Sequence, residues 1–183
     1  SFDRANIKYF VQPKKSVLPN IIQYINEHPD DSGIIYCLSR KGTEEMANNL
    51  KENGINSAYY HAGLSSIERA KVQDDFIKDK IRVMVATIAF GMGIDKSNVR
   101  FVMHADLPKN IESYYQETGR AGRDGLPSEA ILFYSNADVI KLKRFALIEG
   151  NEEQSDIMRK KLQQMTDYEK MKKCRRQYLM EYF

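Results

Sequence analysis

Cysteine is scarce in this sequence, and long apolar runs are absent from it. The two cysteines, Cys37 and Cys174, lie far apart, which excludes a disulfide-rich scaffold and favours a reduced, cytoplasmic setting. No apolar run approaches the roughly 20 residues that a membrane-spanning helix needs, so we expect no membrane partner. The first residues have no signal-peptide character. Since the chain does not begin with methionine, we expect a fragment of a larger protein.

A phosphate-binding P-loop is also missing. A domain that hydrolyses nucleoside triphosphates needs a G-x-x-x-x-G-K-S/T loop, and this chain contains no Gly-Lys pair. The companion acidic motif at a strand end is absent as well. Residues 91–93, Gly-Met-Gly, lack the third glycine and the following helix of a dinucleotide-binding fingerprint. The sequence therefore predicts no complete nucleotide-hydrolysing centre within the chain.

The composition is that of a soluble globular protein. Hydrophobic residues make up 42% of the 183 residues and charged residues 29%, which allows one domain of ordinary size with a true core. The formal net charge of +3 permits a nucleic-acid partner without arguing for one. The basic runs near the C-terminus are, taken alone, more typical of a solvated helix face.

Short apolar runs alternate with amphipathic stretches over residues 1–150, which predicts βαβ units and a mostly parallel sheet with helices on both faces. In such α/β folds, ligands bind at the carboxyl ends of the strands. Helical spacing beyond Gly150 predicts a C-terminal helical extension over residues 151–183. We expect strands at residues 7–11, 33–38, 57–60, 81–87, 99–104 and 129–134. We expect helices at residues 15–27, 41–53, 65–78, 111–118 and 136–148.

The most informative segment is residues 116–125, Q-E-T-G-R-A-G-R-D-G. Arg120 and Arg123 carry planar, always-charged groups that suit phosphate oxygens, and the glycines let backbone approach a ligand closely. Because the P-loop is missing, we infer a domain that completes the nucleotide site of another domain. The alternative is that one arginine forms a structural ion pair with Glu117 or Asp124.

Several motifs resemble those of one helicase family. Residues 86–96 (A-T-I-A-F-G-M-G-I-D-K) and 116–125 resemble motifs V and VI of superfamily 2 helicases, and their wording resembles the RecQ family in particular. The chain resembles the second RecA-like lobe of a RecQ DNA helicase (residues 1–150), a three-layer α/β sandwich, followed by the truncated start of the zinc-binding subdomain (residues 151–183). Further matches are F-D-R-A-N-I, I-I-Y-C-L-S-R, Y-Y-H-A-G-L and C-R-R-Q-Y-L-M-E-Y-F. Ala5 stands where the family commonly has proline.

This resemblance implies an ATP-dependent 3′–5′ DNA helicase that acts in DNA repair, recombination and replication. Its partners would be single-stranded and duplex DNA, ATP and the first RecA-like lobe. It would act in the bacterial cytoplasm, in association with the nucleoid. ATP and Mg²⁺ would be bound mainly by the first lobe, so we expect the fragment alone to be inactive. The family's zinc site has four cysteine ligands, of which Cys174 would be one. We therefore expect no bound Zn²⁺ here and a frayed or non-natively packed terminal segment.

The resemblance also implies residue roles at the nucleotide. Arg123 resembles the arginine finger that meets the γ-phosphate, and Arg120 resembles its partner, although which of the two is the finger stays open. Gln116 would couple to or sense the phosphate, and Gly93 and Asp95 would lie near the ribose or the arginines. The alternatives are a surface glutamine for Gln116 and an ordinary Asx turn or helix cap for Asp95.

Four residues are candidates for contacts with the DNA backbone: Ser39, Arg40, Arg69 and Thr87. Hydroxyls and arginines make phosphate contacts that carry no sequence information, which suits a motor that accepts any sequence. Arg40 could instead be solvated, and Arg69 could pair with Glu68 or Asp75. We expect a structural role for His61 and a core position for Cys37.

Two other classes of function stay open. The first is a non-catalytic module that uses the same fold to bind nucleic acid only. The second is a free-standing doubly wound enzyme with a small phosphorylated substrate, against which the missing phosphate loop and the lack of a nucleophile–base pair argue.

Overall fold

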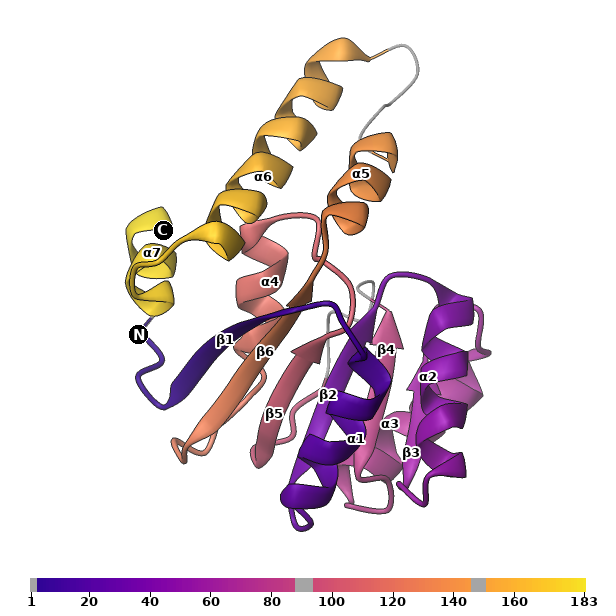
Figure 1. Ribbon diagram of the computed structural model, residues 1–183. Helices are drawn as coiled ribbons and strands as arrows, with labels where there is room; N and C mark the ends of the chain where they lie inside the picture. The colour runs from indigo at the N-terminus through magenta and orange to yellow at the C-terminus, as the bar shows by residue number, and fades with distance from the viewer. Residues whose placement is uncertain (1–2, 88–93, 146–150) are drawn as a thin grey trace.

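A single parallel sheet organises the chain, for which a computed structural model describes residues 3–87, 94–145 and 151–183 (Figure 1). All six strands of the described residues are parallel, in the order β1-β6-β5-β2-β4-β3. The strands are β1 (Ile7–Pro13), β2 (Ser32–Cys37), β3 (Ser57–Tyr60), β4 (Val83–Thr87), β5 (Val99–His104) and β6 (Ser128–Tyr134). The helices are α1 (Val17–Glu27), α2 (Arg40–Glu52), α3 (Ser66–Ile77), α4 (Ile111–Thr118), α5 (Asn136–Phe145), α6 (Glu152–Lys170) and α7 (Arg175–Tyr182).

These elements confirm the predicted α/β fold with its parallel sheet and C-terminal helices. Local chemistry explains why α3 begins where it does. The Ser65 side chain accepts a hydrogen bond from the Glu68 amide while the Glu68 carboxylate accepts one from the Ser65 amide, a reciprocal capping box. α2 ends before Gly54, whose φ of +76° suits glycine at this position.

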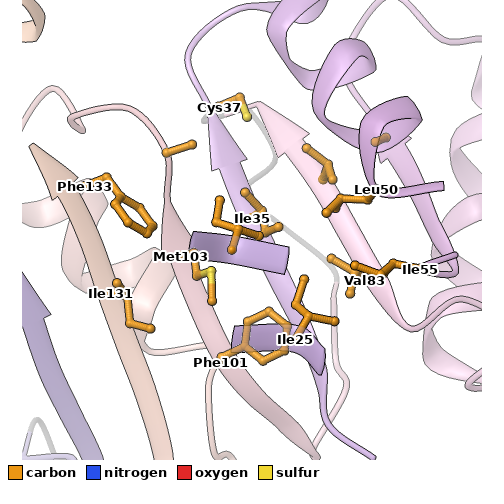
Figure 2. Packing of buried hydrophobic residues seen from close by; sticks show 14 residues of the cluster. Ile25, Ile35, Cys37, Leu50, Ile55, Val83, Phe101, Met103, Ile131 and Phe133 are labelled. Atoms are coloured by element: carbon orange, nitrogen blue, oxygen red, sulfur yellow. The ribbon is translucent and has the colours of Figure 1, made fainter. Parts of the chain in front are cut away.

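One face of the sheet is covered by α1 and α2 (Figure 1). Figure 2 shows the cluster beneath them, in which aliphatic and aromatic side chains of four strands meet aliphatic side chains of the two helices. The ring of Phe101 on β5 lies directly over Gly33 of β2, where an added Cβ would overlap the ring carbons. Glycine is therefore required in the buried strand β2 at this position. Cys37 is buried at the end of the same strand, as expected, and burial raises the pKa of its thiol to about 12.

The opposite face is covered by α3, α4 and the segment that leads into β5. A second cluster joins Phe76 of α3 to Ile94 and Ala121, over Ile34 and Tyr36 of β2. The helix α4 reaches this face from the carboxyl end of β5 and runs back towards the start of β6 (Figure 1). Consequently, residues that follow α4 lie near the amino-terminal ends of the strands, away from the loops that follow β2 and β4.

The C-terminal helices pack against the sheet lobe rather than apart from it. A third cluster brings Leu162 and Tyr168 of α6 onto Tyr114 of α4 and Leu132 of β6. Of the expected frayed or non-natively packed terminal segment, the fraying is wrong for α7, because Leu179 is only 1% exposed in this cluster; whether the packing is native stays untested. Figure 1 shows α7 beside the segment that leads into β1, where Arg176 Nε lies 3.3 Å from Asp3 Oδ1. The division into residues 1–150 and 151–183 stays a prediction.

Among the described residues, no helix has the length and apolar character to span a membrane.

Candidate functional site

The segment from residue 119 to residue 125, here called the arginine loop, lies at the amino-terminal end of the sheet. The amide of Gly122 donates to the Val99 carbonyl at 2.8 Å, and the amide of Asp124 donates to the Ser97 carbonyl at 3.1 Å. Gly122 has a φ of +57°, and a Cβ there would collide with Asn6 Nδ2 and lie 2.9 Å from the Leu126 carbonyl oxygen. The loop therefore depends on glycine both for its backbone conformation and for space.

Arg123 extends from this loop towards solvent. Its Nη1 donates to the Ile94 carbonyl at 3.2 Å and to Asp95 Oδ1 at 3.2 Å. The Arg123 side chain is 38% exposed and that of Asp95 is 92% exposed. The structure thus places Asp95 beside a motif VI arginine, which is one of the two positions that the resemblance implied. The guanidinium is oriented by this pair and remains accessible.

Arg120 has a very different environment, since only 6% of the residue is exposed. It lies near the buried hydroxyl of Tyr36 on β2. Burial raises the pKa of Tyr36, and the positive charge of Arg120 opposes that rise. The two arginines that the sequence presents as a matched pair therefore differ in accessibility: one faces the sheet and the other faces solvent.

Sequence analysis left open a structural ion pair between one of the two arginines and Glu117 or Asp124. The hydrogen bonds found for these two carboxylates are with other residues. Asp124 accepts a hydrogen bond from Arg100 Nη2 at 2.5 Å, and this bond holds the pKa of Asp124 below its usual range. Glu117 is hydrogen-bonded to His104 at 2.5 Å in the core. The ion pair of Arg123 is with Asp95, a partner that the alternative did not name.

A buried lysine anchors the segment that carries Asp95. Lys96 is 3% exposed, its Nζ lies 2.5 Å from Asp79 Oδ1, and it sits 5.3 Å from the centroid of the Phe76 ring. Lys96 is the last residue of the segment 86–96 that resembles motif V, but we predicted no role for it. Its proximity to Asp79, 17 positions earlier, could not be read from the sequence, because it depends on how α3 crosses the sheet.

The positions of the two remaining nucleotide-binding candidates, Gln116 and Gly93, say little about their predicted roles. Gln116 lies on the exposed side of α4, and its side chain makes no hydrogen bond to another residue of the described ranges. Gly93 lies outside the described residues, so its predicted role is not addressed.

The four DNA candidates gather at the carboxyl end of the sheet. Thr87 ends β4 and pairs in register with Cys37 at the end of β2, so Ser39, two residues later, lies at the same edge. Ser39 caps α2 by accepting a hydrogen bond from the Gly42 amide at 3.0 Å. Arg40 is exposed at the start of α2, whereas Thr87 is only 7% exposed.

Arg69 occupies the first turn of α3, which also begins at this edge. Its expected partners are engaged elsewhere, since Glu68 caps its own helix and Asp75 pairs with Lys71 at 3.3 Å. Within the described ranges, Arg69 makes no ion pair. Both arginines of the group are therefore available to an anionic ligand.

His61 has the structural role that we expected, and it gains a partner that sequence analysis missed. Its Nδ1 accepts a hydrogen bond from the Gly63 amide at 3.0 Å, so Nε2 carries the proton and donates to Glu44 at 2.7 Å. This chain of contacts ties the loop after β3 to α2. An added Cβ at Gly63 would lie 3.4 Å from Arg40 Nη1, so the tied loop borders the Arg40 side chain.

A second polar network at this edge was also missed. Lys14 Nζ lies 2.6 Å from Asp106 Oδ1 and 2.9 Å from Asp138 Oδ1, and Asp106 Oδ2 accepts from the Leu38 amide at 2.7 Å. These bonds join the ends of β1, β2 and β5 to α5. Lys14, Leu38 and Asp106 lie one or two residues after a strand, and this position was the only sign in the sequence that they could belong to a site. That they come together depends on the strand order, which the sequence does not reveal.

Cys174 does not form a zinc site with the residues described. It is exposed at the start of α7, and Cys37 is buried in the sheet. The described residues contain no group of three or more His, Cys, Asp or Glu side chains placed to hold a metal. A structural zinc site needs four ligands, and the residues that the structure describes bring no such set around Cys174.

Comparison with protein families gives two matches along the chain. Residues 13–125 match the family described as "Helicase conserved C-terminal domain", and residues 136–183 match "RecQ zinc-binding". The first match covers both the carboxyl-edge residues and the arginine loop.

Similar proteins carry the same assignment. The chain is 48% identical over its whole length to the "ATP-dependent DNA helicase RecQ" of Haemophilus influenzae, of which it covers 30%. It is also 48% identical, again over its whole length, to the "RecQ-like DNA helicase BLM" of Xenopus laevis, of which it covers 14%. The chain thus spans less than a third of the length of these relatives.

A solved structure shares the fold. The crystal structure of a DEAD box protein from Methanococcus jannaschii matches 78% of this chain with a TM-score of 0.65 and 29% identity, over 39% of that protein. The family match, the identities and the shared architecture agree with one another. The chain therefore belongs to the helicase C-terminal domain family and is the C-terminal helicase lobe of a RecQ-type protein of superfamily 2.

Proposed function

We propose that this lobe forms one wall of the ATP site of an ATP-dependent DNA helicase that moves 3′ to 5′ along single-stranded DNA. The facing wall would be a P-loop lobe that binds ATP and Mg²⁺, since this chain contains no P-loop. Curated relatives are named ATP-dependent DNA helicases. Such a motor would act on single-stranded and duplex DNA at a bacterial nucleoid, and in the longer protein Cys174 would be one of four zinc ligands.

The observation that carries the proposal is the accessible, oriented guanidinium of Arg123. In phosphoryl transfer, negative charge on the transferring group must be neutralised in the transition state, and an arginine from outside the P-loop is well suited to this. Arg123 is held at 3.2 Å by Asp95 and by the Ile94 carbonyl, which fixes its direction before ATP arrives. An arginine that is already oriented loses less entropy on contact with the phosphate.

Energetic costs favour Arg123 over Arg120 as the finger. An exposed ion pair such as Arg123–Asp95 is worth about 1 kcal/mol or less, so a polyphosphate competes with Asp95 easily. Arg120 is buried, and moving it out would leave polar groups of the core without its charge, at a cost of several kcal/mol. Arg120 would instead support the site from within the lobe, and Asp95 would hold Arg123 when ATP is absent.

The carboxyl edge would hold the DNA. Ser39, Arg40 and Arg69 present hydroxyl and guanidinium groups at the ends of neighbouring elements, without a side-chain arrangement that selects a base. Contacts of this type bind the sugar–phosphate backbone and tolerate any sequence. Thr87 is more buried and would contribute through its position at the end of β4.

Arg123→Ala in a two-lobe protein that contains this chain tests the proposal. We expect DNA-stimulated ATP hydrolysis to fall about 10³-fold, with DNA affinity unchanged, because the transition state loses its cation from this wall. Arg159→Ala is the matched control, since Arg159 is an exposed arginine paired with Asp156 on α6, away from the loop. Unchanged hydrolysis together with lost DNA affinity would replace this proposal with a non-catalytic nucleic-acid module.

A further inference from the structure

Two side chains from the segment before β1 bind the backbone of the arginine loop. Arg4 Nη1 donates to the Gly119 carbonyl at 2.9 Å, and Arg4 Nη2 donates to the Ala121 carbonyl at 2.8 Å. Asn6 Nδ2 donates to the carbonyls of Gly122 at 2.8 Å and Leu126 at 2.9 Å. Three carbonyls of the arginine loop, and that of Leu126 directly after it, thus have side-chain partners from residues far earlier in the chain. Together Arg4 and Asn6 are called the N-terminal brace.

The brace acts on the backbone that carries both arginines. The carbonyls that Arg4 binds belong to the residues on either side of Arg120, and the Gly122 carbonyl belongs to the residue just before Arg123. Neither brace residue contacts the Arg123 guanidinium, whose described contacts are with Ile94 and Asp95. Arg123 is therefore fixed in two places, at its backbone by the brace and at its guanidinium by the segment after β4.

A second arginine of this lobe, Arg82, also donates hydrogen bonds to backbone carbonyls, but it lies away from the arginine loop. Arg82 donates to the carbonyls of Ile25, His28 and Asp31, at 2.8, 2.5 and 2.8 Å, and so holds the end of α1. Like Arg4, it is half-buried. Arg82 lies at the start of β4 against a helix that carries none of the nucleotide candidates. Its contacts are those of a structural arginine, which makes it a direct comparison for Arg4.

We propose that Arg4 and Asn6 are positioning residues for ATP hydrolysis, which act by holding the arginine loop so that Arg123 meets the γ-phosphate in the right geometry. The inference rests on the proposed function of Arg123. The charge-assisted hydrogen bonds from Arg4 to carbonyls are short and directional, so they add to the backbone bonds that the amides of this glycine-rich turn already make. Catalysis by an arginine finger is sensitive to placement, since a displacement of about 1 Å can cost about 10²-fold in rate.

A double-mutant cycle in the two-lobe protein tests this inference. We expect Arg4→Ala to lower kcat by about 10²-fold, with the affinity for a non-hydrolysable ATP analogue nearly unchanged. When Arg123 is already alanine, adding Arg4→Ala should change the rate by no more than about threefold, because both residues act through one group. Arg4→Lys should give an intermediate kcat, since a lysine ammonium lacks the planar fork that reaches two carbonyls.

Arg82→Ala is the matched control, with all rates measured below the unfolding temperature of each variant. It should lower the unfolding temperature without changing kcat, and Asn6→Ala provides a second, milder variant if Arg4→Ala fails to fold. An unchanged kcat in Arg4→Ala and Asn6→Ala, an equal fall in Arg82→Ala, or full additivity with Arg123→Ala would each overturn the inference. If Arg123→Ala itself keeps full activity, the proposed function fails instead.

Discussion

The two ends of the sheet hold their arginines in opposite ways. At the amino-terminal end, the backbone of the arginine loop is bound by Arg4 and Asn6, and the Arg123 guanidinium is tied to Asp95. At the carboxyl end, Arg40 and Arg69 make no ion pair within the part of the chain that is described. A group that meets one phosphorus centre in one geometry benefits when it is already oriented, whereas contacts with the DNA backbone carry no sequence information and are not made at a reacting centre. The difference in restraint therefore matches the difference in proposed task.

Among the stability changes predicted here, we expect the largest from Gly122→Ala, which disturbs the backbone of the arginine loop. A Cβ at a φ of +57° would be strained, would collide with Asn6 Nδ2 and would meet the Leu126 carbonyl oxygen at 2.9 Å. We expect this chain to lose about 3 kcal/mol of unfolding free energy, from backbone strain and overpacking together. Urea unfolding followed by circular dichroism measures the loss.

Gly125→Ala in the same loop separates the two causes. Gly125 has a φ of +82° but nothing within 4 Å of an added Cβ, so only backbone strain of about 1 kcal/mol should appear. Equal losses for the two variants would show that the contacts with Asn6 and Leu126 do not restrain the loop.

A pH test examines the other end, where α6 covers Tyr134 at the end of β6. Burial raises the pKa of Glu169 to about 7, opposed by Tyr134, Lys170 and Arg175 and reinforced by Asp138. Because the folded state holds this proton more tightly than the unfolded state, its contribution to stability is complete below about pH 4.5 and is lost as the pH rises through 7.

Glu169→Gln should remove that dependence. The difference in unfolding free energy between the variant and the parent should grow by about 2 kcal/mol in favour of the variant between pH 5 and pH 8. Urea unfolding at the two pH values gives the result. A difference that does not change with pH would mean that the carboxyl group is not held neutral against β6.

The smallest expected effect is on DNA affinity at the carboxyl edge. Arg69→Ala should weaken binding of single-stranded DNA about fivefold and reduce the slope of log affinity against log salt by about 0.7, the value of one phosphate contact. Fluorescence anisotropy over a salt series in the two-lobe protein measures both. Lys78→Ala, just beyond the far end of α3, is the matched control and should change neither. If the two variants weaken binding alike, the edge is not the DNA site.

Much of the fold followed from local patterns. The apolar run at residues 33–38, which contains most of β2, and the serine that caps α3 at residue 65 act over a few residues, so the sequence carries their signal directly. For the C-terminus we expected fraying or non-native packing, and the fraying was wrong because it assumed that missing zinc ligands would leave α7 without support. Leu179 instead packs into an apolar cluster with α4 and α6, which needs no metal.

The candidate site was less predictable, since its geometry depends on strand order. The sequence presents Arg120 and Arg123 as equivalent, but the turn at Gly122 directs one under the sheet face and the other to solvent. The carbonyl contacts of Arg4 and Asn6 join segments far apart in the chain, so no spacing rule reveals them. The pairing of Lys96 with Asp79 is hidden for the same reason.

We propose that ATP hydrolysis depends on the arginine loop, whereas DNA binding depends on the carboxyl edge of the sheet. Single-turnover ATP hydrolysis at saturating single-stranded DNA, measured for Arg123→Ala and Arg40→Ala in the two-lobe protein, tests it most directly. We expect the rate of hydrolysis to fall about 10³-fold in Arg123→Ala and to stay within about twofold of the parent rate in Arg40→Ala. A normal rate in Arg123→Ala, or an equal loss in both variants, would contradict it.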